Sequence, residues 1–260
     1  MISTRSNQHS NDIEVGAPKT GTNCQGVDSP PSIGGGTPKR NGLASIFASL
    51  SFVIGFALFS TVLVDLSDDD QSSLEELKVV QDNEKVYYLS NMILYICFGF
   101  AQLILTIGMA HSSLKTFPSV SMVGLALGIV WSTLVLAAGM VGNVGAKECL
   151  DLLKSDPEAA ATLWKVIRTI HSGLGGGNEV VGGAWVLVAT WSNFKARGCQ
   201  DLGLLDKITF GIANVAGWAG LLSTVPIVAE SCAVVFGVSM ILWYALFGVL
   251  LIVRSYQNRD

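Results

Sequence analysis

Residues His171–Trp191 read HSGLGGGNEVVGGAWVLVATW. The back of this stretch, Val180 to Trp191, is as apolar as a membrane-spanning helix. Its front is rich in glycine and carries one carboxylate, Glu179. A carboxylate inside a span is costly to bury, so it is a functional-site hypothesis by default. The stretch therefore indicates a membrane protein and singles out one residue for attention.

The rest of the chain supports a membrane class. Of its 260 residues, 50% are hydrophobic and only 14% are charged, whereas soluble domains carry about a quarter charged residues. Six apolar runs each have the length of about 20 residues that a helix needs to cross a bilayer. They cover residues 43–66, 90–110, 120–141, 174–194, 208–228 and 232–253. We therefore predict an all-α, polytopic membrane helical bundle with six transmembrane helices, formed by residues 43–255.

The fourth run is the weakest of the six. Residues 180–194 alone are short for a crossing, and the run becomes long enough only by absorbing its glycine-rich front. A broken or re-entrant start is the alternative, because irregular backbone at that depth must be covered by protein or line a cavity. A five-span chain would place the basic residues Lys195, Arg197 and Lys207 outside, which disfavours it.

Residues 1–42 are polar throughout and rich in Ser, Asn, Thr, Gly and Pro. Such a segment cannot bury enough apolar surface to offset the entropy of ordering, so we expect a disordered cytoplasmic tail. It lacks the early apolar core of a secretory signal peptide. Most of the 16 basic residues lie on the inner side if the N-terminus is cytoplasmic, and the first outer loop is acidic. We expect a cell-membrane protein with both termini inside.

The second outer loop, about residues 144–173, contains a helix signal of its own. Asp156, Pro157 and Glu158 form a favourable helix start. Apolar residues then recur at helical spacing over residues 157–171. The pattern predicts an interfacial amphipathic helix anchored by Trp164, or one that packs on the bundle.

Polar groups gather toward the predicted outer leaflet, and they are the candidate ligand-binding residues. They are Asn91, Asn143, His171, Asn178, Glu179 and Glu230. Glu179 has three interpretations: a carboxyl that hydrogen-bonds neighbouring helices, a ligand or proton site in an outward-facing cavity, or a metal ligand with His171 and Glu230. The metal interpretation is the weakest, because no helical i, i+3 or i+4 His/Glu pair holds these residues together.

Several function classes lack their sequence signals. The motifs G-x-S-x-G and H-E-x-x-H and the Walker loop are missing, and GLGGGNE follows no predicted strand. We therefore predict no catalytic residue, no cofactor and no enzymatic activity. The five cysteines have neither metal-ligand spacing nor a C-x-x-C pair. The net charge of -4 without a basic face speaks against nucleic acid as a partner.

The C-terminal half carries a recognisable series of motifs. A Gly-rich segment with Glu179 precedes Gly183-Ala184-Trp185-Val186-Leu187, the basic loop 195–207, Gly217-Trp218 to Pro226, and Trp243 to Gly248, Leu251 and Arg254. In this the chain resembles a family of six-span, mainly bacterial integral membrane proteins known only as a domain of unknown function. The resemblance covers about residues 43–255 and is strongest after residue 173. It implies a six-helix bundle and supplies no activity.

The expected function is therefore that of a multi-pass membrane protein. Besides the lipid bilayer, we expect it to bind or transport a small solute or lipid at the outer-leaflet polar cluster. Two alternatives remain: a lipid-modifying membrane enzyme that uses Glu179 with His171, and a structural or assembly subunit of a membrane complex.

Overall fold

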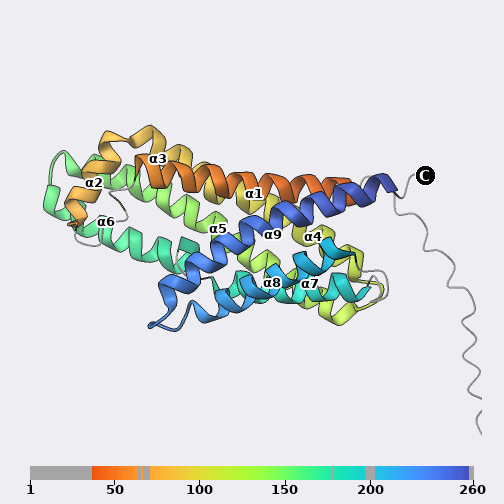
Figure 1. The fold of residues 1–260 in the computed structure, drawn as a ribbon. Coiled ribbons are helices and arrows are strands. Elements are labelled where there is room, and N and C mark those ends of the chain that lie inside the picture. The colour runs from red at the N-terminus through yellow and green to blue at the C-terminus, as the bar shows by residue number, and fades with distance from the viewer. Residues whose placement is uncertain (1–36, 64–65, 67–70, 177–178, 197–202, 258–260) are drawn as a thin grey trace, which may run out of the picture. The chain divides into compact units, whose positions relative to one another are not determined.

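The computed structural model describes residues 37–63, 66, 71–176, 179–196 and 203–257, and within them the chain is helical without strands (Figure 1). The elements are α1 Thr37–Val62, α2 Ser73–Asp82, α3 Glu84–Asn91, the π-helical η2 Met92–Cys97, α4 Phe98–Ser113, α5 Pro118–Leu153, α6 Pro157–His171, the π-helical η3 Ser172–Gly176, α7 Val180–Ala196, α8 Leu204–Leu222 and α9 Ala229–Gln257. The predicted all-α class is confirmed. The predicted tail lies outside the described residues up to residue 36, and its last residues, 37–42, already belong to α1.

Within the described residues, four helical segments are long and apolar enough to cross a membrane. They are Pro38–Val62, Glu84–Ser113, Pro118–Leu153 and Ala229–Gln257. Large apolar side chains project from these helices into the surroundings; Phe56 on α1, Phe100 on α4 and Val234 on α9 are more than half exposed. Apolar surface on this scale is typical of a protein whose surroundings are lipid. The chain is therefore a membrane-embedded helical protein.

The predicted second outer loop is wrong over its first part. Residues 144–153 continue α5, which runs without a break from Pro118 to Leu153. The charged residues in this part lie on the exposed side, while Ala146, Cys149 and Leu150 are buried at helical spacing. A helix of 36 residues is about 54 Å long, well beyond the ~30 Å of a hydrocarbon core. The helix α5 is therefore longer than one crossing of a hydrocarbon core requires.

The predicted fourth and fifth spans also have different boundaries. Residues 174–194 do not form one helix, because η3 ends at Gly176 and α7 begins only at Val180. The interrupted start is the alternative that the glycine content favoured, since each glycine in a helix costs up to ~1 kcal/mol relative to alanine. The predicted fifth span, 208–228, ends early at Leu222, ahead of Pro226, whose ring is incompatible with a helix interior.

The helices enclose an aromatic core. Phe98, Trp131, Trp185, Trp243 and Tyr244 are almost completely buried in it. Their rings meet edge to face or tilted at centroid distances of 5.2–5.8 Å. Such aromatic pairs add to the stabilisation that apolar burial provides.

Helices α1 and α9 run antiparallel side by side (Figure 1). A Cβ added at Gly42 would lie 2.9 Å from the carbonyl oxygen of Gly248, so the two backbones almost touch. Near the same place, the Lys39 ammonium lies 5.8 Å from the centre of the Tyr256 ring. The first and last described helices therefore begin and end at one end of the bundle, here called the terminal end.

A second, smaller apolar core lies at the opposite end. It is built by α2, α3, the last turns of α5 and α6, which together we call the cap (Figure 1). Its buried residues include Leu77, Tyr87, Cys149 and Trp164. The helix predicted at residues 157–171 is confirmed, and the Asp156 carboxylate caps it by accepting the Ala159 N–H at 3.0 Å. Trp164 is buried against α2 and α5, so the helix packs on the protein through this residue, which is therefore not a lipid anchor.

Candidate functional site

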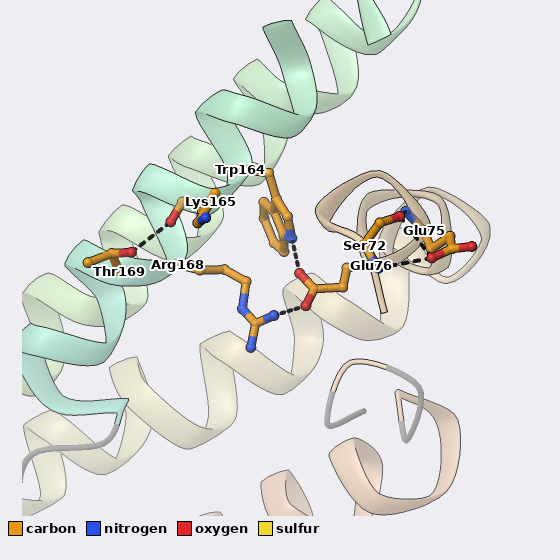
Figure 2. A network of polar contacts seen from close by, with 7 residues as sticks. All are labelled: Ser72, Glu75, Glu76, Trp164, Lys165, Arg168 and Thr169. Carbon is orange, nitrogen blue, oxygen red and sulfur yellow. Dashed lines mark hydrogen bonds and ion pairs between the residues drawn. The ribbon is translucent and has the colours of Figure 1, made fainter. Parts of the chain in front are cut away.

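The cap is fastened by one buried carboxylate, Glu76 of α2 (Figure 2). The indole N–H of Trp164 donates a hydrogen bond to Glu76 Oε2 at 2.8 Å, and the Arg168 guanidinium pairs with the other carboxylate oxygen. Trp164 and Arg168 are one helical turn apart on α6, so both reach the same acceptor. This network joins the segment after α1 to the helix after α5.

The helix that carries Glu76 has a well-defined start (Figure 2). The Ser72 hydroxyl accepts the Glu75 N–H at 3.3 Å, and the Glu75 carboxylate accepts the Ser72 N–H at 2.9 Å, which forms a capping box. The bonds from the Ser72 N–H and hydroxyl hold the pKa of the Glu75 carboxyl below its usual value. The capping box therefore fixes the start of α2 and with it the direction in which this helix presents Glu76.

A cavity of about 380 Å³ opens between the cap and the bundle, and we call it the cap cavity. It is lined by Phe56, Phe59, Ser60, Leu66, Tyr87, Asn91, Leu94, Tyr95, Gly142, Trp164, Ile167, Arg168, His171 and Ser172. One wall is apolar and comes mainly from α1, and the other is polar and comes from α3 and α6. This volume lies in the range of small-molecule sites, about 300–1,000 Å³.

Two of the predicted site residues, Asn91 and His171, meet in the cap cavity. A Cβ added at Gly142 would lie 3.2 Å from His171 Cδ2 and 3.4 Å from Asn91 Nδ2, so both side chains rest against the same point of α5. The Asn91 amide is completely buried beside the Tyr87 hydroxyl, yet neither its oxygen nor its nitrogen has a well-aligned hydrogen bond within the described part of the chain. His171 Nε2 is likewise unsatisfied there.

The His171 ring is held in place and is neutral. It packs edge-on against the Tyr95 ring, with 4.8 Å between the ring centres. Burial lowers the pKa of His171 to about 4, and the positive charge of Arg168 contributes to this shift. A neutral imidazole offers one donor and one acceptor, so with Asn91 the cavity presents a set of unfilled hydrogen-bonding groups of both kinds.

Glu179 lines a second cavity, of about 340 Å³, which we call the Glu179 cavity. The residue is fixed through its backbone: its N–H donates to Ser223 Oγ at 3.3 Å, and its carbonyl accepts the Gly183 N–H at 2.8 Å. Three residues, Phe56, Leu94 and Tyr95, line both cavities. Glu179 is therefore a neighbour of the Asn91–His171 site across a shared aromatic wall.

The remaining predicted residues do not join this group. Asn143 lines neither cavity, although its side-chain oxygen is buried without a hydrogen bond in the described structure. Glu230 is exposed in the first turn of α9 and lines neither cavity. Asn178 lies outside the described residues. Across the described ranges, no three His, Cys, Asp or Glu side chains come together as a metal site would require.

Sequence reasoning missed three residues of the site: Glu76, Arg168 and Tyr95. Glu76 is one of many acidic residues in its segment, and nothing in the local pattern distinguishes it. Arg168 had a weak signal, because its spacing from Trp164 places both on one face of α6. Tyr95 reads as an ordinary apolar residue of a span, and its position between the two cavities follows only from the packing.

Comparison with known proteins finds no protein family, no curated protein and no solved structure that matches the chain. The resemblance to a six-span bacterial family stays a prediction. The function must therefore be argued from the geometry of the two cavities.

Proposed function

We propose that the chain crosses the cell membrane six times, with both termini in the cytoplasm. Four of the crossings would be the membrane-length segments, and the other two would be α7 and α8, which pack on each other and on the bundle. From Val180 to Phe194 and from Ile208 to Ala229 the sequence has no charged residue. An even number of crossings agrees with the position of the α1 start beside the α9 end. The cap would then lie on the outer side.

We infer further that the protein binds a small amphipathic molecule in the cap cavity. The observation that carries this proposal is the pair of unsatisfied polar side chains, Asn91 and His171, that face a cavity of about 380 Å³. A buried polar group without a partner is costly, at about 1–3 kcal/mol each, so a cavity that keeps two of them suits a ligand that completes their hydrogen bonds.

The cavity walls indicate the chemistry of the ligand. Glu76 neutralises Arg168, and His171 is uncharged, so the polar wall has no net charge to attract an ion. Opposite it stand Phe56, Phe59 and Leu94. A neutral head with hydroxyl or amide groups and an apolar body fits this pair of walls. A monoacylglycerol has this character.

Binding is better supported than transport. A transporter needs a polar path from the cavities to the terminal end, and Gln102 is the buried amide on that route. Its side chain is engaged on both sides: it accepts the Tyr244 hydroxyl at 2.5 Å and donates to Thr106 Oγ1 at 3.2 Å. Aromatic residues of the core fill the space around it. Trp218 of α8 does not line such a path either, because it is 60% exposed on the outside of the bundle.

Binding is also better supported than lipid-modifying catalysis. The enzyme hypothesis requires His171 to contact the Glu179 carboxyl directly or through one water. His171 Nε2 has no hydrogen-bond partner in the described structure, and the two residues line different cavities with Tyr95 between them. We therefore propose a non-enzymatic binding protein.

The test is binding of monoolein to the full-length protein in nanodiscs, measured by native mass spectrometry. We expect Asn91→Leu, which keeps the branched shape and removes the amide, to weaken binding at least about tenfold, since it removes two hydrogen-bonding groups. The matched control is Asn214→Leu, because the Asn214 amide bonds Phe210 within α8. Equal binding by the Asn91 variant and the natural protein would leave a structural or assembly role as the better account.

A further inference from the structure

The Glu179 cavity combines one carboxylate with a wall of aromatic rings. It is lined by Phe52, Phe56, Leu94, Tyr95, Phe98, Trp131, Val135, Gly175, Glu179, Ala233, Val234, Gly237, Val238 and Ile241. No basic side chain is among them. Among the residues that the structure describes, the cavity therefore has a single acidic group in surroundings that are otherwise apolar or aromatic.

The Glu179 carboxyl has neither an ion pair nor a hydrogen bond within the described ranges of the chain, although its backbone N–H and C=O are both bonded. An isolated carboxylate in such surroundings is costly unless a positive charge approaches it. The backbone bonds to Ser223 and Gly183 hold the residue at the start of α7, so it cannot leave the cavity without breaking them. The site is thus built around an unpaired carboxyl group, whose ionised form a positive charge would stabilise.

The rings around this group are fixed by their neighbours. Phe98 meets Phe52 at 4.4 Å and Trp131 at 5.8 Å between ring centres, edge to face in both cases. A Cβ added at Gly182 would lie 2.7 Å from the Trp131 ring, so α7 presses directly against the indole. Aromatic faces attract cations through their negative quadrupole, and Trp is the strongest of them. The aromatic wall and the Glu179 carboxylate thus both favour a positively charged ligand.

The cavity borders the lipid-facing surface. Val234 and Val238 on α9 are 65% and 55% exposed, and Phe56 on α1 is 65% exposed. All three line the cavity. A molecule dissolved in the bilayer can therefore reach it from the side, without passing through the cap.

We propose that the Glu179 cavity is a binding site for an organic cation with an apolar body, whose ammonium group pairs with Glu179 and lies against the ring of Trp131. A volume of about 340 Å³ suits a substituted ammonium group with a short apolar part. The ammonium belongs either to a free amphiphilic amine or to a lipid headgroup. The proposal concerns a different cavity from the cap cavity and does not rest on the function proposed there.

The test uses the full chain in nanodiscs and two probes of nearly equal shape. Benzyltrimethylammonium carries the charge, and neopentylbenzene is its neutral carbon isostere. Binding is measured by equilibrium dialysis, with empty nanodiscs subtracted. We expect the natural protein to bind the ammonium at least about tenfold more tightly than the isostere. Glu179→Gln, which keeps shape and removes charge, should reduce this preference severalfold, to what the aromatic wall alone provides, and leave the binding of the isostere unchanged.

Two further variants complete the test. Glu230→Gln removes an exposed carboxylate that does not line the cavity, so the preference should persist. Phe52→Leu should weaken binding of the ammonium severalfold more than binding of the isostere, because it removes a ring but keeps an apolar side chain. A natural protein that binds both probes equally, or a preference that Glu179→Gln leaves undiminished, would overturn the proposal.

The composition of the nanodisc separates the two sources of the ammonium. Phosphatidylcholine carries the trimethylammonium group, whereas galactosyl diacylglycerol is neutral without it. Weaker apparent binding of the probe in phosphatidylcholine would assign the site to a lipid headgroup. Equal binding in both lipids would assign it to a free amphiphilic amine. Both results support an organic-cation site and differ only in its occupant.

Discussion

At the scale of single residues, Glu76 is the buried side chain that joins α2 to α6. It satisfies the buried indole N–H of Trp164 with one oxygen and pairs with Arg168 through the other. Only 5% of Glu76 is exposed, whereas 45% of the Arg168 side chain is exposed. Loss of the carboxylate therefore leaves the buried Trp164 N–H without a hydrogen-bond acceptor, whereas the Arg168 guanidinium can turn to solvent.

We expect Glu76→Ala to lower the free energy of unfolding of the cap by about 2–3 kcal/mol. The cost is mainly that of an unsatisfied indole N–H and of the space left in the cap, with a smaller part from the half-exposed ion pair. Hydrogen exchange of α2 and α6 amides would measure it. Asp151→Ala breaks the exposed pair with Lys154 and should leave exchange unchanged. Equal effects of the two substitutions would contradict the assigned role of Glu76.

A second prediction concerns pH. The pKa of His171 is about 4 in the folded chain against an ordinary value of 6.5, because the ring is buried and Arg168 is close. Between these values the unfolded chain binds a proton that the folded chain does not. Above pH 6.5, His171 therefore does not reduce the free energy of unfolding. As the pH drops from 6.5 toward 4, the free energy of unfolding falls.

Between pH 7 and pH 5, this group should cost about 2 kcal/mol of cap stability. The His171→Phe variant keeps a ring against Tyr95 and removes the titration, so its stability should change less over the same interval. Denaturant titrations of both proteins at the two pH values would measure the difference. A variant that loses as much stability as the natural protein would show that other groups control the response.

The sequence allowed part of the site to be predicted. Asn91, His171 and Glu179 are polar residues within or beside long apolar runs, so each was recognisable, and two of them do share a cavity. Glu230 was equally conspicuous in the sequence, yet it points to the outside, because a residue in the first turn of a helix can face any side. Which polar side chains meet is a property of helix rotation and packing, and spacing along one chain does not contain it.

At the scale of elements, α7 and α8 approach each other so closely that their backbones almost touch. A Cβ added at Gly183 would lie 2.7 Å from the Gly217 carbonyl oxygen and 2.9 Å from the Gly220 Cα. These atoms belong to backbone, so they cannot move aside as a flexible side chain would. Glycine is required here for close approach of the two helices.

Gly183→Ala should therefore destabilise the bundle by about 1–3 kcal/mol, because the two helices must separate. Gly211→Ala is the control on α8, where an added Cβ meets nothing within 4 Å. Alanine there should be neutral or stabilise by up to about 1 kcal/mol through helix propensity. Thermal unfolding of both variants in the same nanodiscs measures the contrast. Similar midpoints for the two variants would refute the close packing of α7 on α8.

The ends of a helix were predictable from the sequence where the helix ends together with its apolar run. The apolar runs located the helical segments, but α5 continues well beyond its run because charged residues such as Lys147 and Asp151 lie on the exposed side of the same helix. Hydropathy marks where a chain leaves lipid, and it does not mark where a helix ends. The start of α7 was uncertain for a related reason: glycine lowers helix propensity, but tertiary contacts decide whether a glycine-rich segment is helical.

At the scale of the whole described structure, the two apolar cores and the two cavities follow one arrangement. The bundle core lies among α1, α4, α5, α7, α8 and α9, the cap core lies at one end of these helices, and the cap cavity occupies the junction. Tyr95 lines both cavities, so a ligand that moves its ring acts on both. Six crossings would place this junction on the outer side and the terminal end in the cytoplasm.

The topology is testable with an impermeant maleimide applied to intact cells. Glu158→Cys, exposed on the cap, should react from outside, whereas Arg40→Cys and Tyr256→Cys, exposed at the terminal end, should react only after permeabilisation. The native Cys149 was expected in an outer loop, but it is fully buried in the cap core and should stay unlabelled until the cap unfolds. It thus reports cap integrity in the same experiment. Labelling of Arg40→Cys and Tyr256→Cys from opposite sides would require an odd number of crossings and would overturn the six-span arrangement.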